Sequence, residues 1–205
     1  MLAANEAVAR WFGDRELPTI YRVHGVPDEE KLDAFLELAR AHGFDVPESP
    51  PDPRALNDLL ERFKGHAQQR ALNQLLLRAM MQAVYSPENI GHYGLAAEHY
   101  LHFTSPIRRY PDLILHRHLK AALKGNRLAK GWKDKAGAYL EEACPHLSGR
   151  ERASEAAERE AVTWKKCQFM ADKVASTFWG YVTGVASFGF FVQLEDYFVD
   201  GLVHV

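Results

Sequence analysis

Residues 164–194, WKKCQFMADKVASTFWGYVTGVASFGFFVQL, change their hydrophobic period part-way along. Up to Val174 the apolar side chains recur every three or four residues, as on one face of an α-helix. From Phe190 to Leu194 they recur at every second residue, as on one face of a β-strand. The sequence therefore predicts an α+β fold that is mostly helical first and ends in a sheet, with the change at Thr177.

The segment 177–205 is typical of a small antiparallel β-barrel that is incomplete. Its four glycines fit turns and bulges, but a segment of this length is enough for only three strands, so we expect the natural chain to continue. Phe190, Val192 and Leu194 form one apolar face. Phe191 falls on the opposite face beside Gln193, and the pattern therefore gives its ring no place in a core.

Upstream of residue 177 the pattern is that of amphipathic helices. Asp28 is placed to begin a helix whose apolar residues lie at helical spacing, and Gly43 is placed to end it in a left-handed cap. Prolines at 47, 50, 51 and 53 form a stiff connection. Extended structure is expected at 20–24, and a short strand with a loop at 85–104. The predicted helices are 2–12, 28–43, about 56–63, about 72–84, 106 to about 123 with a kink or division at Pro111, about 132–143 and about 150–176. Ser148 and Gly149 are expected to separate the last two helices.

Composition restricts the class of protein. With 47% apolar residues in 205, the chain can form one hydrophobic core or two small ones. It has no apolar run long enough to cross a bilayer and no apolar secretory segment at its start, which favours the cytoplasm. Cys144 and Cys167 have no nearby partner at metal-ligand spacing, so neither a disulfide framework nor a zinc site is expected.

The charges are unevenly distributed although the net charge is only -2. Residues 28–61 hold ten acidic and three basic side chains, whereas residues 108–135 hold nine basic and two acidic ones. A basic stretch of this kind can bind a polyanion locally. The alternative is a solvated face of a basic helix, and charge alone does not separate the two.

The densest chemical signal is TSPIRRYPD, residues 104–112. Ser105 is a good helix N-cap and Pro106 a good first helical residue, so Arg108 and Arg109 would lie at the positive end of a helix dipole. Two cations at that end are unfavourable unless an anion binds there, and a guanidinium group matches two phosphate oxygens. The alternative is that one of the arginines pairs with Asp112 four or three residues on.

The same region carries a resemblance to a known family. Residues 102–113, HFTSPIRRYPDL, with His116, Arg117 and the stretch 85–94, resemble the RNB family of processive 3′ to 5′ exoribonucleases, which includes ribonucleases R and II. The resemblance implies that 1–176 is the C-terminal part of an RNB catalytic domain. It also implies that 177–205 is similar to the start of an OB-fold RNA-binding module. The implied activity is hydrolysis of RNA to nucleoside 5′-monophosphates.

The resemblance implies roles for individual residues. Arg108 matches the arginine that stabilises charge at the scissile phosphate, and Arg109 matches a neighbour that contacts the RNA backbone, with Ser105 beside them. Glu158 matches a glutamate near the terminal nucleotides, although by pattern alone it is a solvated helix carboxylate. Three residues match the base-stacking surface of the OB module: Phe188, Phe191 and His204.

Family members hold two Mg²⁺ ions on an aspartate cluster, which this sequence lacks. The acidic run at 28–33 fits the start of a helix, and histidine pairs such as His116 and His118 point too far apart to chelate one ion. The implied Mg²⁺ ligands are therefore expected outside this chain, and the chain alone is expected to be inactive. The expected partner is single-stranded RNA, with no membrane, no small-molecule cofactor and a monomeric state. Two alternatives remain: a non-catalytic module that binds single-stranded RNA, or a helical interaction scaffold.

Overall fold

The computed structural model describes residues 1–47, 51–66, 68–124 and 131–205. The chain divides into two compact units, Met1–Glu151 and Arg152–Val205. The division lies within the long helix α6 (Trp132–Met170), which therefore contributes residues to both units. The domain boundary predicted at Thr177 lies where helix gives way to sheet, and the assignment of two domains there remains a prediction.

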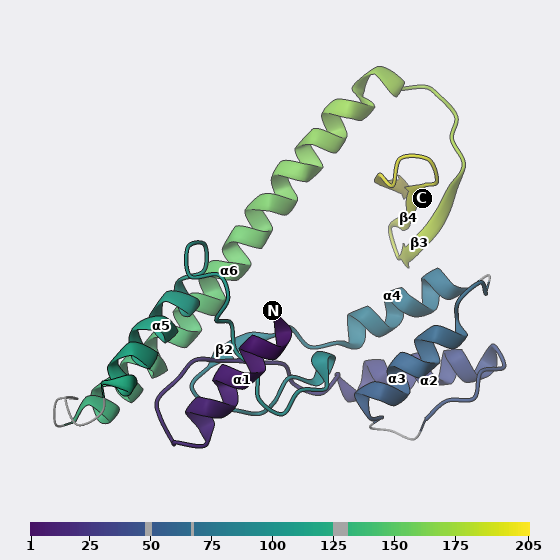
Figure 1. Cartoon of the computed structure of the whole chain (residues 1–205). Helices are drawn as coiled ribbons and strands as arrows, with labels where there is room; N and C mark the ends of the chain where they lie inside the picture. The colour runs from purple at the N-terminus through teal and green to yellow at the C-terminus, as the bar shows by residue number, and fades with distance from the viewer. Residues whose placement is uncertain (48–50, 67, 125–130) are drawn as a thin grey trace. The chain divides into compact units, whose positions relative to one another are not determined.

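Three helices in unit 1 pack around the largest apolar cluster (Figure 1, blue): α2 (Glu29–Ala41), α3 (Pro53–Arg62) and α4 (Gln69–Ala79). The side chain of Asp28 accepts a hydrogen bond from the Lys31 N–H at 3.1 Å, which caps α2. Gly43 follows α2 with a φ of 84°, a conformation that favours glycine. Both ends of α2 thus confirm the sequence prediction.

The rest of unit 1 is built from helices α1 (Leu2–Gly13) and α5 (Tyr110–Leu123) and a two-stranded antiparallel sheet, β1 (Tyr21–Val23) with β2 (Val84–Ser86). Helix α5 contributes to two apolar clusters at once. Leu115 packs with α1 and β1, whereas Ile114 packs with Leu140 and Cys144 of α6. The start of α5 is therefore held between two cores.

Helix α4 is shorter than predicted. It ends at Ala79, and Met80 is already extended at φ -67° and ψ 135°. The expected continuation to Val84 is wrong because Val84 pairs with Val23 in the sheet. A short 3₁₀ turn, η1 (Tyr93–Leu95), lies in the loop that follows β2.

The start of the basic helix is also corrected. The prediction placed Ser105 at the N-cap and Pro106 in the first turn, but α5 begins at Tyr110 and its N-cap is Arg109. Pro111 has no N–H to donate to the carbonyl of residue 107, which disfavours a helix that runs through from 106 and agrees with the division that the sequence allowed at this proline. A proline is tolerated at the first positions of a helix, and here it marks the start.

One helix, α6, replaces the two predicted at 132–143 and 150–176. It runs from Trp132 to Met170 with Pro145 inside it, and the short η3 (Ala171–Lys173) follows. Ser148 does not interrupt the helix, and its hydroxyl donates to the carbonyl of Cys144 at 3.0 Å, one turn earlier.

Unit 2 contains the predicted sheet: β3 (Gly180–Ala186), β4 (Gly189–Leu194) and β5 (Asp200–His204), antiparallel in that order. The register shifts between Val182 and Gly184, as at a β-bulge. At Gly189 (φ 150°) a Cβ would lie 2.2 Å from the carbonyl oxygen of Val203, so only glycine fits. The three strands form no closed barrel in the described part of the chain, and the mixed helix-and-sheet fold class is confirmed.

Two sequence features lie partly outside the described residues. They are Pro50, in the proline connection, and Arg127 and Lys130, in the basic stretch. Among the helices described, none has the length and apolar character needed to cross a membrane.

Candidate nucleic-acid interface

Side chains from two helices fix the segment that leads to the arginines. Asn5 of α1 donates to the Tyr100 hydroxyl at 3.1 Å and accepts the Phe103 N–H at 3.1 Å. His116 of α5 stacks on Phe103, with 4.1 Å between ring centroids, and its Nε2 lies 2.9 Å from the Phe103 carbonyl oxygen. The chain therefore reaches Ser105 in a defined position although this segment belongs to no sheet.

Residues 105–109 form a closed turn. The Ser105 carbonyl accepts hydrogen bonds from the Arg108 N–H at 3.2 Å and the Arg109 N–H at 3.0 Å. Ser105 thus acts through its backbone and does not cap a helix. At the tip, Ile107 is 98% exposed. Arg108 is also exposed, and within the described chain its side chain makes no hydrogen bond or ion pair.

The second arginine is placed differently. Nη2 of Arg109 donates to Oδ1 of Asp112 at 2.7 Å, with the Arg109 side chain 20% exposed and Asp112 completely buried. This is the pairing with Asp112 that the sequence left open as the alternative for one of the two arginines. Arg109 thus forms this pair, and Arg108 forms none among the described residues, whereas the RNA contact that the resemblance implies for each arginine stays a prediction.

Behind this pair lies a buried polar network that the sequence pattern did not predict. The Tyr85 hydroxyl lies 2.9 Å from Nδ1 of His102. Burial, with the nearby charges of Arg109 and Arg22, lowers the pKa of His102 to about 4, so the ring is neutral at pH 7. The guanidinium of Arg22 lies 4.7 Å from the centroid of the Tyr85 ring and pairs with Glu151. These residues come from four distant segments, and no local pattern links them.

The three predicted stacking residues lie close together in unit 2, with Phe191 in β4, His204 in β5 and Phe188 in the turn between β3 and β4. The ring centroids of Phe188 and Phe191 are 6.4 Å apart, and those of Phe188 and His204 are also 6.4 Å apart. Phe188 is 47% exposed, Phe191 is 41% exposed and His204 is exposed. The exposure predicted for Phe191 from its strand position is confirmed.

Comparison with known proteins places the chain in a family. The RNB domain model matches residues 1–125. This chain belongs to the RNB family. Ribonuclease R of Aquifex aeolicus (strain VF5) is 46% identical over 207 residues, which cover 100% of this chain and 29% of that protein. Ribonuclease R of Escherichia coli (strain K12) is 42% identical over 212 residues, covering 100% of this chain and 26% of that protein.

The fold of the RNB chain also matches a solved structure. Mycoplasma genitalium RNase R in complex with ribose methylated single-stranded RNA superposes with a TM-score of 0.92 at 28% identity, covering 100% of this chain and 32% of that one. The RNB chain therefore spans less than a third of the length of these relatives. The fold class predicted from the sequence and the family resemblance are both confirmed.

Glu158 lies in unit 2 of the RNB chain, on an exposed face of α6. It lines a shallow groove of about 430 Å³ together with Phe169, Tyr197 and two lysines, Lys165 and Lys166. Nζ of Lys166 donates to the Phe198 carbonyl at 3.0 Å. The strands of unit 2 hold no lysine or arginine, so the cations of this unit come from α6 and η3.

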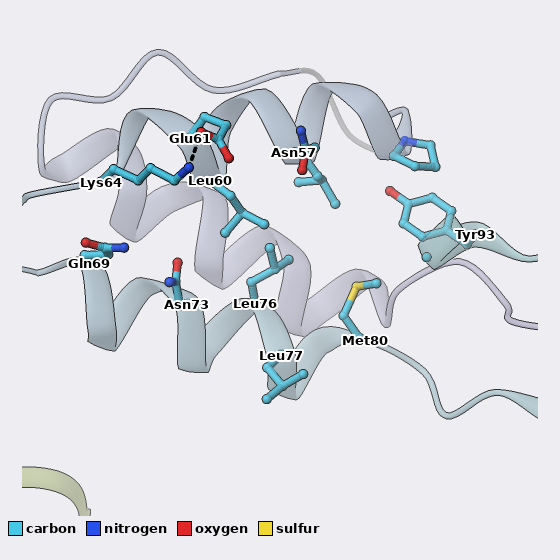
Figure 2. A pocket seen from close by; sticks show the side chains of 13 residues that line it. Asn57, Leu60, Glu61, Lys64, Gln69, Asn73, Leu76, Leu77, Met80 and Tyr93 are labelled. Carbon is cyan, nitrogen blue, oxygen red and sulfur yellow. Dashed lines mark hydrogen bonds and ion pairs between the residues drawn. The ribbon is translucent and has the colours of Figure 1, made fainter. Parts of the chain in front are cut away.

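A second, larger pocket lies among the helices of unit 1. Figure 2 shows Leu60 of α3 and Leu76 of α4 turned toward each other across it, with Tyr93 of η1 at one end. Its volume is about 490 Å³, and an ion pair between Lys64 and Glu61 lies at its rim. It contains none of the predicted site residues, and three of its leucines, Leu56, Leu60 and Leu76, belong to or pack against the apolar cluster of α2, α3 and α4.

The residues that the structure describes do not form a metal site. No group of three histidine, cysteine, aspartate or glutamate side chains among them lies close enough to hold an ion. His116 and His118 bond in separate places, to the carbonyl oxygens of Phe103 and Pro18. The described residues thus do not fit the two-metal centre that the family resemblance implies.

Proposed function

We propose that this chain is the part of a 3′ to 5′ exoribonuclease that binds single-stranded RNA and supplies an arginine to the phosphate being hydrolysed. The observation that supports this most is the turn 105–109, which is anchored at both ends and presents Arg108 to solvent with no carboxylate partner among the described residues. An exposed guanidinium group held on a rigid turn is well placed to bind phosphate oxygens. The full-length relatives named above are ribonucleases.

In this proposal Arg108 acts by electrostatics. As water attacks the terminal phosphodiester, negative charge grows on the phosphate oxygens, and a pre-positioned guanidinium stabilises it. The products are a nucleoside 5′-monophosphate and an RNA shortened by one nucleotide. The Mg²⁺ ions that the resemblance implies would be held by aspartates that the described residues do not supply.

Unit 2 would hold RNA upstream of the reacting bond. Phe188, Phe191 and His204 form an exposed aromatic group on which successive bases can stack, at about 1 to 3 kcal/mol per base. We propose that this sheet is the start of an OB-fold module and that Glu158 lies near the terminal nucleotides. A cytoplasmic location and a monomeric state belong to the same proposal.

The proposal is tested by removing the guanidinium group at the tip of the turn. Arg108→Ala should weaken binding of a labelled single-stranded oligoadenylate by about tenfold and lower the slope of log K against log[salt] by about 0.7. Fluorescence anisotropy across a salt series measures both quantities. Arg10→Ala, which removes an exposed arginine on α1, is the matched control and should change neither. Equal behaviour of the two variants would overturn the proposal.

A non-catalytic RNA-binding module is the second candidate, and the lack of a metal-ligand group in the described residues favours it. The two candidates make the same prediction for RNA affinity. They differ in the full-length protein, which should release nucleoside monophosphates in the first case and none in the second.

A further inference from the structure

One carboxylate oxygen holds both ends of the turn that carries Arg108. Oδ1 of Asp112 accepts the Ser105 N–H at 2.8 Å, at the beginning of the turn. The same oxygen accepts Nη2 of Arg109 at 2.7 Å, at its end. Between these two points the turn is closed by hydrogen bonds to the Ser105 carbonyl, and its exposed residues are Ile107 and Arg108.

Stability alone is a poor explanation for this arrangement. When an ion pair is buried, the free energy of hydration that the two charges lose is roughly offset by their attraction. A protein with an apolar pair of similar size at such a site is often at least as stable. Here the cost is higher, since Nε of Arg109 and Oδ2 of Asp112 are buried without a hydrogen-bond partner among the described residues. Such a pair is better explained by the geometry that it imposes on the turn.

We infer that Asp112 is a positioning residue, which acts with Arg109 to hold the 105–109 turn in the conformation that presents Arg108 to an RNA phosphate. Arg109 is then an anchor of the turn and makes no phosphate contact of its own. The inference rests on the proposed function, because it assigns Asp112 and Arg109 their effect through Arg108.

A double-mutant cycle on the 205-residue chain tests this. Asp112→Asn keeps an oxygen acceptor for the Ser105 N–H but removes the charge that holds Arg109. It should weaken binding of the labelled oligoadenylate several-fold in the wild-type background. In the Arg108→Ala background it should have almost no further effect. A purely structural role would weaken binding by the same factor in both backgrounds, and that result would overturn the inference.

Asp134→Asn is the matched control. Asp134 is the acidic residue in the first turn of α6, as Asp112 is in α5, but it is exposed and makes no side-chain hydrogen bond within the described chain. This variant should bind the oligoadenylate like the wild type. A loss equal to that of Asp112→Asn would show a general charge effect and would also overturn the inference.

Two further measurements cover the other outcomes. If Asp112→Asn does not fold, Arg109→Gln replaces it in the cycle with the same expectation of non-additivity. In the wild-type chain, hydrogen exchange at the Ser105 amide should be as slow as at the amides in the middle of α5, and fast exchange would contradict the anchored turn. If Arg108→Ala leaves affinity unchanged while Ser105 is protected, the proposed function fails but the anchored turn stands.

Discussion

Two adjacent arginines in this chain have opposite environments, and a single carboxylate produces the difference. Asp112 is buried and pairs with Arg109, so the charge of Arg109 is neutralised inside the protein. Arg108, one residue earlier, remains exposed. Residue type and spacing alone do not distinguish them, because Asp112 lies within reach of either arginine along a helix.

The buried His102 makes the stability of the chain sensitive to acid. Its folded pKa is about 4, below the ordinary value of 6.5, because burial and the charges of Arg109 and Arg22 disfavour the protonated ring. Between these two values the unfolded chain binds more protons than the folded chain. The stabilising contribution is therefore complete above pH 6.5 and is lost as the pH falls toward 4.

Urea unfolding at a series of pH values between 7 and 4 checks this. His102→Gln should reduce the fall in unfolding free energy as the pH drops. Part of the fall should remain, because burial also lowers the pKa of His92 to about 4. His42→Gln changes an exposed histidine and serves as the control. An unchanged pH dependence in His102→Gln would contradict the assignment.

At the scale of elements, α6 is tied to the small sheet by a hydroxyl group. The buried Ser148 of α6 accepts the N–H of Tyr85 in β2 at 2.9 Å and donates to the Cys144 carbonyl. This N–H faces away from β1, so the strand needs an acceptor from another element. Ser148, which the sequence placed between two predicted helices, thus joins one continuous helix to the strand.

Ser148→Ala should destabilise unit 1 by about 1 to 3 kcal/mol, because it leaves the Tyr85 N–H buried without an acceptor. Thermal or urea unfolding measures the effect, and faster hydrogen exchange at the Tyr85 amide locates it. Ser154→Ala, an exposed position on the same helix, should change stability very little. If both variants are equally stable, the link between α6 and β2 is not important for stability.

At the scale of the whole chain, we expect the 205 residues to bind RNA without hydrolysing it. In the proposed function, the basic stretch, Arg108 and the aromatic group of unit 2 would provide contacts for RNA, whereas the described residues provide no group of metal ligands. Family membership and fold do not by themselves supply the metal ligands that hydrolysis would need.

The purified 205-residue chain should therefore bind single-stranded RNA, more weakly as salt rises, and release no nucleotides when Mg²⁺ is added. Chromatography of a labelled RNA after incubation checks the second point. Mononucleotides that appear with Mg²⁺ and disappear in Arg108→Ala would show that the chain is itself a nuclease, contrary to this expectation.

The amino-acid sequence alone specified the features that depend on neighbouring residues. The apolar stripe of α2, its Asp28 cap, the left-handed Gly43 and the alternation that exposes Phe191 are all local patterns, and the structure confirms each of them. The family was also recognisable from the sequence, because residues 102–113 form a continuous motif.

Only the tertiary structure decided where α5 begins, that α6 is one helix, and which arginine has no partner among the described residues. The sequence allowed either arginine to pair with Asp112, and the fold selected Arg109. Other features depend on contacts between segments far apart in the chain, such as Ser148 with Tyr85 and the network around His102. Buried polar groups form hydrogen bonds with the groups that the fold places beside them, and the hydrophobic periodicity of a sequence does not show which groups these are.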